Sequence, residues 1–352
     1  DIWSEPRGVL AGYNWPQFSV HRGRLQMLLH RTVVERLGPD AVETGCRVVG
    51  YENTADGVRL AIDRRGGQGD STDNDHAEVA MARDHVDGRL LIAGDGLHSA
   101  VRRQMHPGEG EPKWGGAVLW RGTAEGRPIR SGASFTLVGS MVQRFVHYPI
   151  GPVDPATGLQ VQNWIAELTK DPTGGWSDSS WNKQVDVDTF LPAFADWNFD
   201  WLDIPSMVGR ADTVWEFPMV DRDPVDRWVD GRVALAGDAA HVMYPVGSNG
   251  ASQAIVDARI LGAKFLEHGV NPDALVAYEQ DLLEDMSALV LRNRGAGPIG
   301  ILGVVEERCG GVFDNIEDVI PRTEVEEFMS GYKAAAGFAI EALNNAPPTI
   351  SV

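Results

Sequence analysis

Hydrophobic residues recur at helical spacing near the start of the chain, in the stretch HRGRLQMLLHRTVVERLG. They occur singly or as adjacent pairs, with three or four positions from one group to the next, and a glycine comes after the last: Leu25, Leu28, Leu29, Val33, Val34, Leu37, Gly38. Such spacing places apolar side chains on one side of a helix, and glycine commonly ends one. We therefore predict an amphipathic helix that ends at Gly38.

Short β-rich runs follow at 47–51, 58–62 and 77–83, and the polar loop GGQGDSTDND separates the last two. Runs of this length bounded by turn residues are typical of strands. They predict a small antiparallel meander. The next stretch, GRLLIAGDGLHSAVRRQM, has the pattern of a strand, a tight turn and a helix.

Between about Lys113 and Val220 the pattern becomes alternating, as in GGAVLWRGTAEG, ASFTLVGSMVQRFVHYPI and LQVQNWIAEL. Alternation of apolar and polar residues predicts a larger antiparallel sheet. We expect a helix in SWNKQVDVDTFLPAFADW. Of the eleven tryptophans, all but Trp3 and Trp15 lie between Trp114 and Trp228. Most of these should fill the core, and a few are candidates for lining a pocket for a flat ligand.

The stretch VALAGDAAHVMYPVGSNGAS predicts a strand over 233–236, an acidic turn, a loop with two glycines and a helix. PDALVAYEQDLLEDMSALVLRNR then has the spacing of a long amphipathic helix. The segment GAGPIGILGVV interrupts this pattern. A last helical segment is predicted over 321–343.

Composition limits the possible functions. The formal net charge is −19, which argues against nucleic acid or an anionic membrane as the main partner. No apolar run approaches the length of a membrane-spanning helix, and the first residues do not have the pattern of a signal or transit peptide. Cys46 and Cys309 form no CxxC pair, and the nine histidines show no metal-binding spacing. A cytoplasmic protein without a metal site is expected.

The acidic turn has the features of a ligand site. The predicted strand delivers Gly237 and Asp238 at its carboxyl end, where α/β sheets bind ligands. Asp238 could accept hydrogen bonds from sugar-like hydroxyls, and Gly247 and Gly250 would expose backbone N–H groups. The following helix would point its positive N-terminal end at an anion or an electron-rich ring. His241 is a candidate base, although packing or structural hydrogen bonding is the more common role for such a residue.

The earlier turn, AGDGLHSAVR, contains Gly94 and Gly96, which could begin a dinucleotide-binding fingerprint. Ser99 occupies the position of the third glycine, and no acidic residue ends a following strand. By itself the pattern does not distinguish a ligand site from an ordinary strand–turn–helix. It places Asp95 at the end of a strand and Arg102 one turn into the helix.

Together, GDGLHSAVR, GDAAHVMYPVGSNGAS and HRGRLQMLL resemble three ordered motifs of one family. They are similar to those of the FAD-dependent aromatic monooxygenases of the p-hydroxybenzoate hydroxylase type, the group A flavoproteins. WSEPRG and FPMVDRDP are most similar to the phenazine hydroxylases of that family, and the chain departs from that pattern after Arg294.

The resemblance implies roles for the matching positions. Arg22 and Gln26 would contact the phosphate or ribityl groups of FAD, and the backbone of Val48 would meet the adenine. Gly237 and Asp238 would hold the ribityl–pyrophosphate region, and Pro245 would lie against the flavin face. Asp95 and Arg102 would support the flavin and nicotinamide phosphates indirectly. The backbone amides at the flavin edge would come from Gly247, Ser248, Asn249, Gly250 and Ala251. Ser252 stands where the family usually has Asn.

The family also begins with a βαβ unit that carries GxGxxG, and this sequence contains no matching stretch. The chain starts with Asp1. We therefore expect a fragment of a longer protein or a decayed relative, and weak FAD binding by the chain alone.

The fold implied is α/β: a discontinuous Rossmann-like FAD-binding domain (1–110 and 221–300) with an inserted antiparallel substrate domain (111–220) and a C-terminal helical tail (301–352). The function implied is aromatic or heteroaromatic hydroxylation with FAD, NAD(P)H and O₂ through a flavin C4a-hydroperoxide. Candidates for the pocket wall are Tyr148, Trp120, Arg121 and Met219. No catalytic side chain is assigned. The substrate, the choice of NADH or NADPH and the oligomeric state stay open.

Three alternatives remain. The first is another flavin chemistry on the same scaffold, such as an oxidase, epoxidase or halogenase. The second is an inactive flavoprotein fragment that only binds ligands. The third is a nicotinamide dehydrogenase, which the missing ribose-binding acidic residue and the acidic-turn motif both disfavour.

Overall fold

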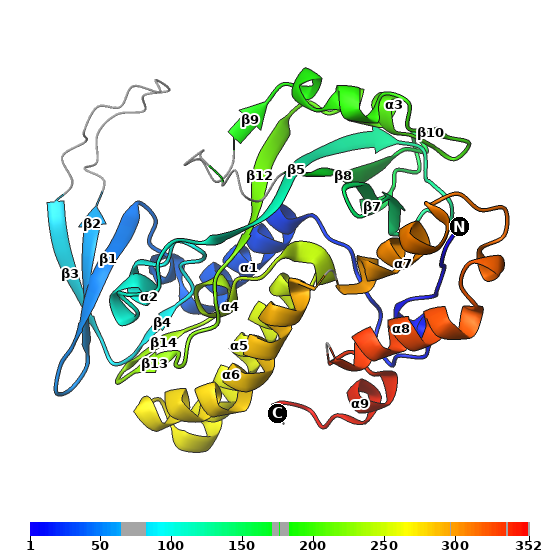
Figure 1. Ribbon diagram of the computed structural model, residues 1–352. Helices are drawn as coiled ribbons and strands as arrows, with labels where there is room; N and C mark the ends of the chain where they lie inside the picture. Colours follow the sequence, from blue (N-terminus) through cyan, green and yellow to red (C-terminus); the bar gives the residue numbers. More distant parts are fainter. Residues whose placement is uncertain (65–81, 171–175, 177–182, 296, 336, 351–352) are drawn as a thin grey trace. The chain divides into compact units, whose positions relative to one another are not determined.

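The computed structural model describes residues 1–352 except 65–81, 171–175, 177–182, 296, 336, 351 and 352 (Figure 1). The chain divides into two compact units, each assembled from separated segments. Unit 1 comprises 1–29, 114–220 and 295–346, and unit 2 comprises 30–113, 221–294 and 347–352. Residues 1–29 and 295–346 thus group with the large sheet, whereas our predicted boundaries separate them from it. The predicted flavin and substrate roles of the domains stay predictions.

Unit 2 is built on a small sheet in which two strands far apart in sequence run parallel. β4 (Leu91–Ala93) pairs with β14 (Val233–Leu235), and β13 (Val229–Asp230) lies antiparallel on the other side of β14. All three residues of β14 are fully buried. A short apolar strand buried on both faces is what a parallel arrangement requires.

A second sheet in unit 2 is an antiparallel meander, as predicted. It consists of β1 (Cys46–Asn53), β2 (Val58–Arg64) and β3 (Ala82–Gly88). The predicted loop GGQGDSTDND and most of the predicted strand 77–83 lie outside the described residues.

Among the described residues, four α-helices lie wholly within unit 2: α2 (Ala100–Met105), α4 (Asp238–His241), α5 (Gly250–His268) and α6 (Pro272–Asn293). α6 begins as its sequence predicts, with the Asn271 side chain accepting from Asp273 N–H and Ala274 N–H. It packs beside α5 and against β14, where the Tyr278 hydroxyl donates to the Leu235 carbonyl at 3.2 Å. The predicted amphipathic helix is therefore confirmed.

The predicted N-terminal helix is also present, as α1 (Arg22–Leu37), and the boundary between the two units falls within it. None of its residues is buried, and Leu28, Leu29 and Leu37 are exposed. Helical spacing therefore predicts the element correctly, but its apolar residues do not form part of a core.

Unit 1 contains a six-stranded sheet of order β6-β7-β8-β5-β12-β9. Its strands are β5 (Lys113–Gly126), β6 (Thr136–Gly139), β7 (Gln143–Val153), β8 (Gln160–Thr169), β9 (Lys183–Val185) and β12 (Val214–Asp221). β5, β6, β7 and β8 pair antiparallel, as predicted. One face carries the core residues Val118, Trp120, Phe145, Trp164 and Ala166.

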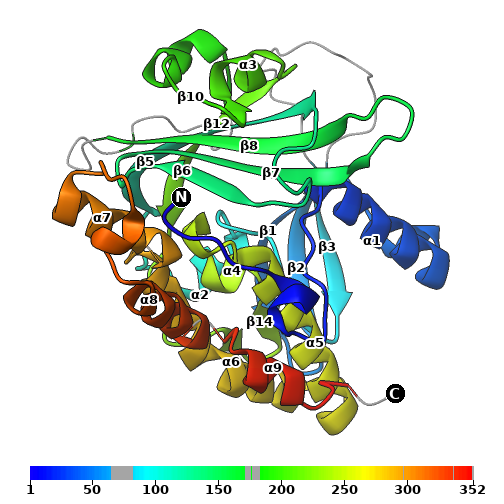
Figure 2. The ribbon, with the colours of Figure 1, turned by 90° about the vertical axis from the view of Figure 1, so that its right-hand side faces the viewer.

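The predicted helix in SWNKQVDVDTFLPAFADW is wrong for its described part, which begins at residue 183. β9 is followed there by two 3₁₀ turns, Val187–Thr189 and Leu191–Phe194. Alternating β-branched residues favour extended backbone, and Pro192 cannot donate to a helix. β10 (Asn198–Phe199), β11 (Leu202–Asp203) and α3 (Ile204–Gly209) follow, and α3 covers the core face of the sheet (Figure 2).

The described residues in the C-terminal part of unit 1 form three α-helices, where one is predicted. α7 (Gly300–Cys309) lies in the segment expected to be an interruption, and α8 (Arg322–Ala335) and α9 (Ile340–Asn345) replace a single helix. Gly337, with φ of +75°, separates α8 from α9. A cluster of buried residues holds α7 and α8 together: Ile301, Val305, Ile320, Val325, Met329. Across the described residues, no helix has the length and apolar character needed to span a membrane.

His147 on β7 should make the stability of the protein depend on pH. It is 1% exposed, its Nε2 atom has no hydrogen-bond partner among the described residues, and burial lowers its pKa to about 4. The unfolded chain, with a histidine pKa of about 6.5, binds the proton more readily. We therefore expect the free energy of unfolding to fall by up to ~3 kcal/mol between about pH 6.5 and pH 4, and to be unaffected by this residue at higher pH.

Denaturant titrations of the native chain and of His147→Gln across this pH range check that prediction. The variant should show a flatter dependence. An equally flattened dependence in His30→Gln, where the residue is exposed, would contradict it.

Candidate functional site

The acidic turn follows β14 directly in unit 2. Ala236 N–H donates to the Ala93 carbonyl at 2.9 Å, and Gly237 then adopts φ +58° and ψ −141°. This region of backbone conformation is essentially restricted to glycine. The next residue, Asp238, is exposed, and its carboxylate has no hydrogen-bond partner in the described part of unit 2. It is free to accept hydrogen bonds from a ligand.

The loop after the turn leads into the N-terminus of α5. A 3₁₀ turn (Pro245–Gly247) and Ser248, with φ of +55°, precede Asn249, whose side chain makes no capping hydrogen bond to the helix. The first amides of a helix have no intrahelical partner, so this end of α5 offers donors and a partial positive charge.

Gly250, the first residue of α5, has space around it. A Cβ atom there would meet only Asp238 Oδ1 at 3.8 Å, an ordinary contact, and its φ is not positive. Gly94 in the earlier turn likewise has an ordinary φ, and a Cβ there would meet nothing within 4 Å. Neither the backbone nor the packing of unit 2 therefore requires glycine at these positions. Close approach of a ligand would explain both.

The earlier turn lies at the same edge of the sheet as the acidic turn, because β4 and β14 are parallel with Ala93 opposite Leu235. In this turn Asp95 Oδ2 accepts from Ala100 N–H at 2.9 Å, and Ser99 Oγ accepts from Arg102 N–H at 2.9 Å. Asp95 thus stabilises the start of α2. The structure brings together two motifs more than a hundred residues apart.

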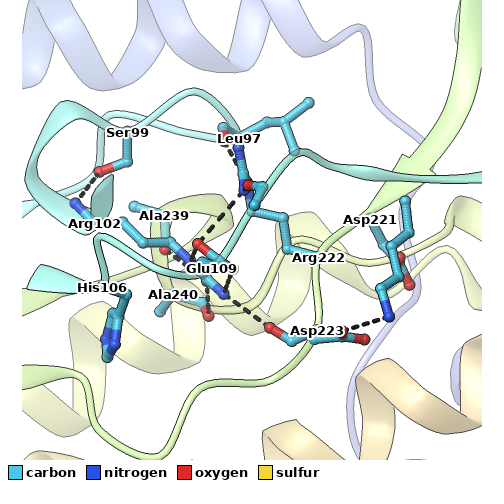
Figure 3. A network of polar contacts seen from close by, with 12 residues as sticks. Leu97, Ser99, Arg102, His106, Glu109, Asp221, Arg222, Asp223, Ala239 and Ala240 are labelled. Carbon is cyan, nitrogen blue, oxygen red and sulfur yellow. Dashed lines mark hydrogen bonds and ion pairs between the residues drawn. The ribbon is translucent and has the colours of Figure 1, made fainter. Parts of the chain in front are cut away.

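Arg102 joins the two turns through a buried network (Figure 3). Its guanidinium is 2% exposed and donates through Nη1 to the carbonyls of Ala239 at 3.0 Å and Ala240 at 2.6 Å. Nε donates to both carboxylate oxygens of Glu109, and Nη2 to the Asp223 carbonyl at 2.9 Å. Because these groups occupy the guanidinium, Arg102 can act on a ligand only indirectly, by holding α4 against α2.

The network continues through residues that the sequence did not single out. Arg222 donates to the Leu97 carbonyl at 3.0 Å and lies 3.5 Å from Glu109 (Figure 3). Arg294 pairs with Asp221 at 2.6 Å and with Asp223 at 2.8 Å. Burial raises the pKa of Asp221, and the hydrogen bond from Arg294 opposes that rise. These ion pairs hold the segment DRDP in place. The sequence motif by itself does not identify Arg294 as their partner.

His241 has a structural position. Its Nε2 lies 2.7 Å from Asp257 Oδ2 on α5, and the same oxygen accepts from Gly237 N–H at 2.6 Å. Both side chains are 2% exposed. Asp257 therefore ties the acidic turn to α5, and this arrangement favours the structural role over that of a base. No sequence signal identified Asp257.

Three other residues predicted to contact the cofactor lie outside the two turns. Val48 lies in unit 2 on β1; it is half-buried and pairs with Ile62 of β2 next to a register shift. Arg22 and Gln26 are exposed residues at the start of α1, in the part of that helix that belongs to unit 1. Their proximity to a flavin stays a prediction.

The four candidate pocket residues lie on opposite faces of the unit 1 sheet. Trp120 belongs to the core face, where it stacks on Phe190 with ring centroids 4.8 Å apart and donates to Glu216 Oε2 at 2.8 Å. Arg121 points the other way, as adjacent residues of a strand must. Register places Tyr148 on the face of Arg121, and the Arg121 guanidinium lies over Phe217, two residues before Met219.

These features of unit 2 fit a flavin dinucleotide. The free carboxylate of Asp238 suits ribityl or ribose hydroxyls, and the uncapped end of α5 suits a phosphate or the electron-rich edge of a flavin. The open space at Gly94 and Gly250 allows a ligand to approach the backbone.

Comparison with known proteins agrees with this geometry. A family model described as an FAD binding domain matches residues 202–291. The chain is 39% identical to phenazine 1,6-dicarboxylic acid hydroxylase PhzS of Lysobacter antibioticus over 83% of this chain and 69% of that protein. It is 31% identical to aurachin C monooxygenase/isomerase of Stigmatella aurantiaca over 81% and 65%. The matches thus span about two thirds of these relatives' lengths.

Solved structures show the same fold. HpxO of Klebsiella pneumoniae, complexed with FAD and uric acid, superposes with a TM-score of 0.61 and 25% identity over 90% of this chain and 70% of that one. A salicylate hydroxylase substrate complex superposes with a TM-score of 0.64 and 21% identity over 95% and 77%. The identity and coverage of the phenazine hydroxylase, with the flavin-compatible turns, establish the family: this chain belongs to the FAD-dependent aromatic hydroxylases, the group A flavoprotein monooxygenases.

Proposed function

We propose that this chain serves a monooxygenase that hydroxylates an aromatic or heteroaromatic ring at the expense of NAD(P)H and O₂. The observation that carries the proposal is the meeting of two glycine-containing turns at one sheet edge, beside a free carboxylate and an uncapped helix. FAD, when bound, supplies the redox chemistry, accepting a hydride and activating oxygen.

The chain's own residues would bind and orient that cofactor. Asp238 would accept hydrogen bonds from ribityl hydroxyls, and the amides of the loop between Pro245 and Ala251 would donate to the flavin edge. Arg102 and Asp257 would keep the acidic turn in place, since the Arg102 guanidinium donates to the carbonyls of Ala239 and Ala240 and Asp257 Oδ2 accepts from Gly237 N–H and lies beside His241 Nε2. Arg22, Gln26 and Val48 would contact the remainder of FAD.

The substrate would be a small aromatic molecule. Relatives are named for phenazine 1,6-dicarboxylic acid, 3-amino-4-hydroxybenzoate and 3-hydroxybenzoate. We assign one wall of the substrate site to the face of the unit 1 sheet that carries Arg121, Tyr148 and Met219. We also propose a cytoplasmic location, because both cysteines are free thiols and NAD(P)H is required.

The proposal can be tested with the chain, FAD and NAD(P)H under ¹⁸O₂, using a panel of hydroxybenzoates and phenazine carboxylates. We expect at least one aromatic compound to accelerate NAD(P)H oxidation and to gain one ¹⁸O atom. Hydrogen peroxide formed in amounts equal to the NAD(P)H consumed, with no labelled product from any compound, would contradict hydroxylation and favour an oxidase.

A further inference from the structure

A cavity of about 270 Å³ lies in unit 1, with the N-terminal segment on one side and α8 and the start of α9 on the other. Small-molecule sites in proteins begin at about 300 Å³, close to this value. The described lining of the cavity includes none of the residues that we assign to FAD or to the aromatic substrate. Neither the sequence motifs nor the proposed function accounts for it.

The N-terminal segment runs beside α8 and α9 and is attached there at two places (Figure 1). Lys333 Nζ, on α8, lies 2.6 Å from Glu5 Oε2. The Tyr13 hydroxyl donates to the Phe338 carbonyl, between α8 and α9, at 2.6 Å. The stretch that supplies this side of the lining, residues 3–11, is therefore held close to both of its ends, and the cavity is part of the fold of unit 1.

The lining offers an aromatic ring together with aliphatic and sulfur-containing side chains. Trp3, Ala11, Met329 and Ile340 supply these surfaces. Trp3 packs against the cluster that joins α7 and α8, to which Met329 belongs, and the Arg322 guanidinium lies over its ring, 5.7 Å from the centroid. Aromatic molecules pack favourably on indole rings and on methionine sulfur. An aromatic ligand therefore suits this lining.

The charged groups of the lining neutralise one another. The described lining holds two carboxylates and two cations: Glu5, Glu326, Arg322 and Lys333. Arg322 Nε donates to Glu326 Oε1 at 2.9 Å, and Glu5, besides its pair with Lys333, lies 2.9 Å from the Arg7 guanidinium. A charged ligand would lose its hydration and would have to displace one of these partners to gain another. The lining therefore favours an uncharged ligand.

We propose that this cavity binds a small, uncharged aromatic molecule whose ring packs on Trp3. The indole N–H of Trp3 has no hydrogen-bond partner among the described residues, so the ring can adjust to a ligand without breaking a hydrogen bond. The residues of this site differ from those assigned to FAD and to the substrate. The inference therefore goes beyond the proposed hydroxylation and does not depend on it.

Three flat probes of equal size and different charge test the proposal: naphthalene-2-carboxamide, naphthalene-2-carboxylate and naphthalene-2-carboxamidine. Calorimetric titration gives the affinity. Indole N–H signals in a ¹H–¹⁵N NMR spectrum give the location, and the signal that Trp3→Phe removes belongs to Trp3. We expect the amide to bind with a Kd of ~1 mM or lower and to shift the Trp3 signal whether or not FAD is present. Each charged probe should bind at that signal at least ~5-fold more weakly.

Ala11→Phe should fill the cavity while leaving Trp3 in place. We expect this variant to bind the amide at least ~10-fold more weakly and to unfold within ~3 °C of the native midpoint. Ala334→Phe is the matched control, because it adds the same side chain at an exposed position of α8 outside the described lining. It should bind the amide as the native chain does. Equal weakening in the two variants would show that the probe does not occupy this cavity.

Lys333→Met tests the charge balance. It leaves Glu5 without its partner on α8, and the lining then holds one more carboxylate than cations. The affinity for the amidine relative to the amide should rise ~5-fold or more. Lys264→Met removes a comparable pair in unit 2, where Lys264 Nζ lies 2.7 Å from Asp281 Oδ2, and should leave this ratio unchanged. Equal ratios in the two variants would contradict the assignment of an uncharged ligand.

Three further results would overturn the proposal: a Trp3 signal that no probe shifts, amide binding that is lost when FAD is added, or equal affinity for the amide and both charged probes. The proposed hydroxylation fails on a different observation. A chain that binds the amide at Trp3 yet incorporates no ¹⁸O would contradict hydroxylation while supporting this site.

Discussion

Arg102→Met should lower the free energy of unfolding by about 3–5 kcal/mol, one of the largest effects expected of any single substitution in this chain. The variant would leave the Glu109 carboxylate, whose side chain is 10% exposed, without its main cation. It would also remove the donors that serve the carbonyls of Ala239, Ala240 and Asp223. Buried acceptors left without donors are costly, and here several lose their donors together.

Arg103→Met is the matched control, because it removes the same charge from the next position of α2. Arg103 is exposed, and the hydrogen bond from its guanidinium runs 3.3 Å to the His98 carbonyl. Its substitution should change the free energy of unfolding by less than ~0.5 kcal/mol. Urea titrations followed by far-ultraviolet circular dichroism measure both variants. Similar losses of unfolding free energy in the two variants would show that the buried network around Arg102 does not stabilise the fold as its geometry indicates.

The turns that form the candidate site were predictable because their chemistry is local. Glycine beside aspartate after a short apolar strand specifies a turn that few other residues allow, and Gly237 with φ +58° is the clearest case. The meander and the long sheet were also predictable from alternation. The helix expected in SWNKQVDVDTFLPAFADW is wrong for the described residues from 183 onward, where alternating β-branched residues favour extended backbone and Pro192 lacks an N–H donor.

What could not be predicted depends on contacts between distant segments. Arg102 meets carbonyls that lie 137 and 138 positions away, and nothing near it in sequence identifies them. Asp257 is an ordinary helix residue until β14 brings the Gly237 amide to it. For Trp120 and Arg121, alternation shows that they face opposite sides, but only the neighbouring strands decide which side is core.

The same reasoning separates glycines that the fold needs from glycines that a ligand needs. Gly122 is of the first kind, because a Cβ atom there would lie 2.4 Å from the Trp164 ring. We propose that Gly250 is of the second kind, since its own unit leaves the space open. A substitution at Gly250 therefore tests ligand binding with little risk to folding.

Gly250→Leu should weaken FAD binding by at least ~30-fold, or about 2 kcal/mol, and leave the free energy of unfolding of the apoprotein within ~1 kcal/mol of the native value. The leucine side chain would occupy the open space beside Asp238 at the N-terminus of α5, where we place the flavin. Replacing glycine by leucine in a helix does not by itself disfavour the helix. Quenching of flavin fluorescence measures the affinity, and urea titration the stability.

Gly331→Leu controls for the added side chain. Gly331 also lies in a helix, α8, with an ordinary φ, and a Cβ atom there would meet nothing within 4 Å. This variant should bind FAD as the native chain does. If both variants bound FAD equally well, the open space at Gly250 would not be where the flavin approaches, and the assignment of the acidic turn to FAD would fail. If only Gly250→Leu lost affinity for FAD while keeping its stability, FAD binding would account for a glycine at a position where the fold does not require one.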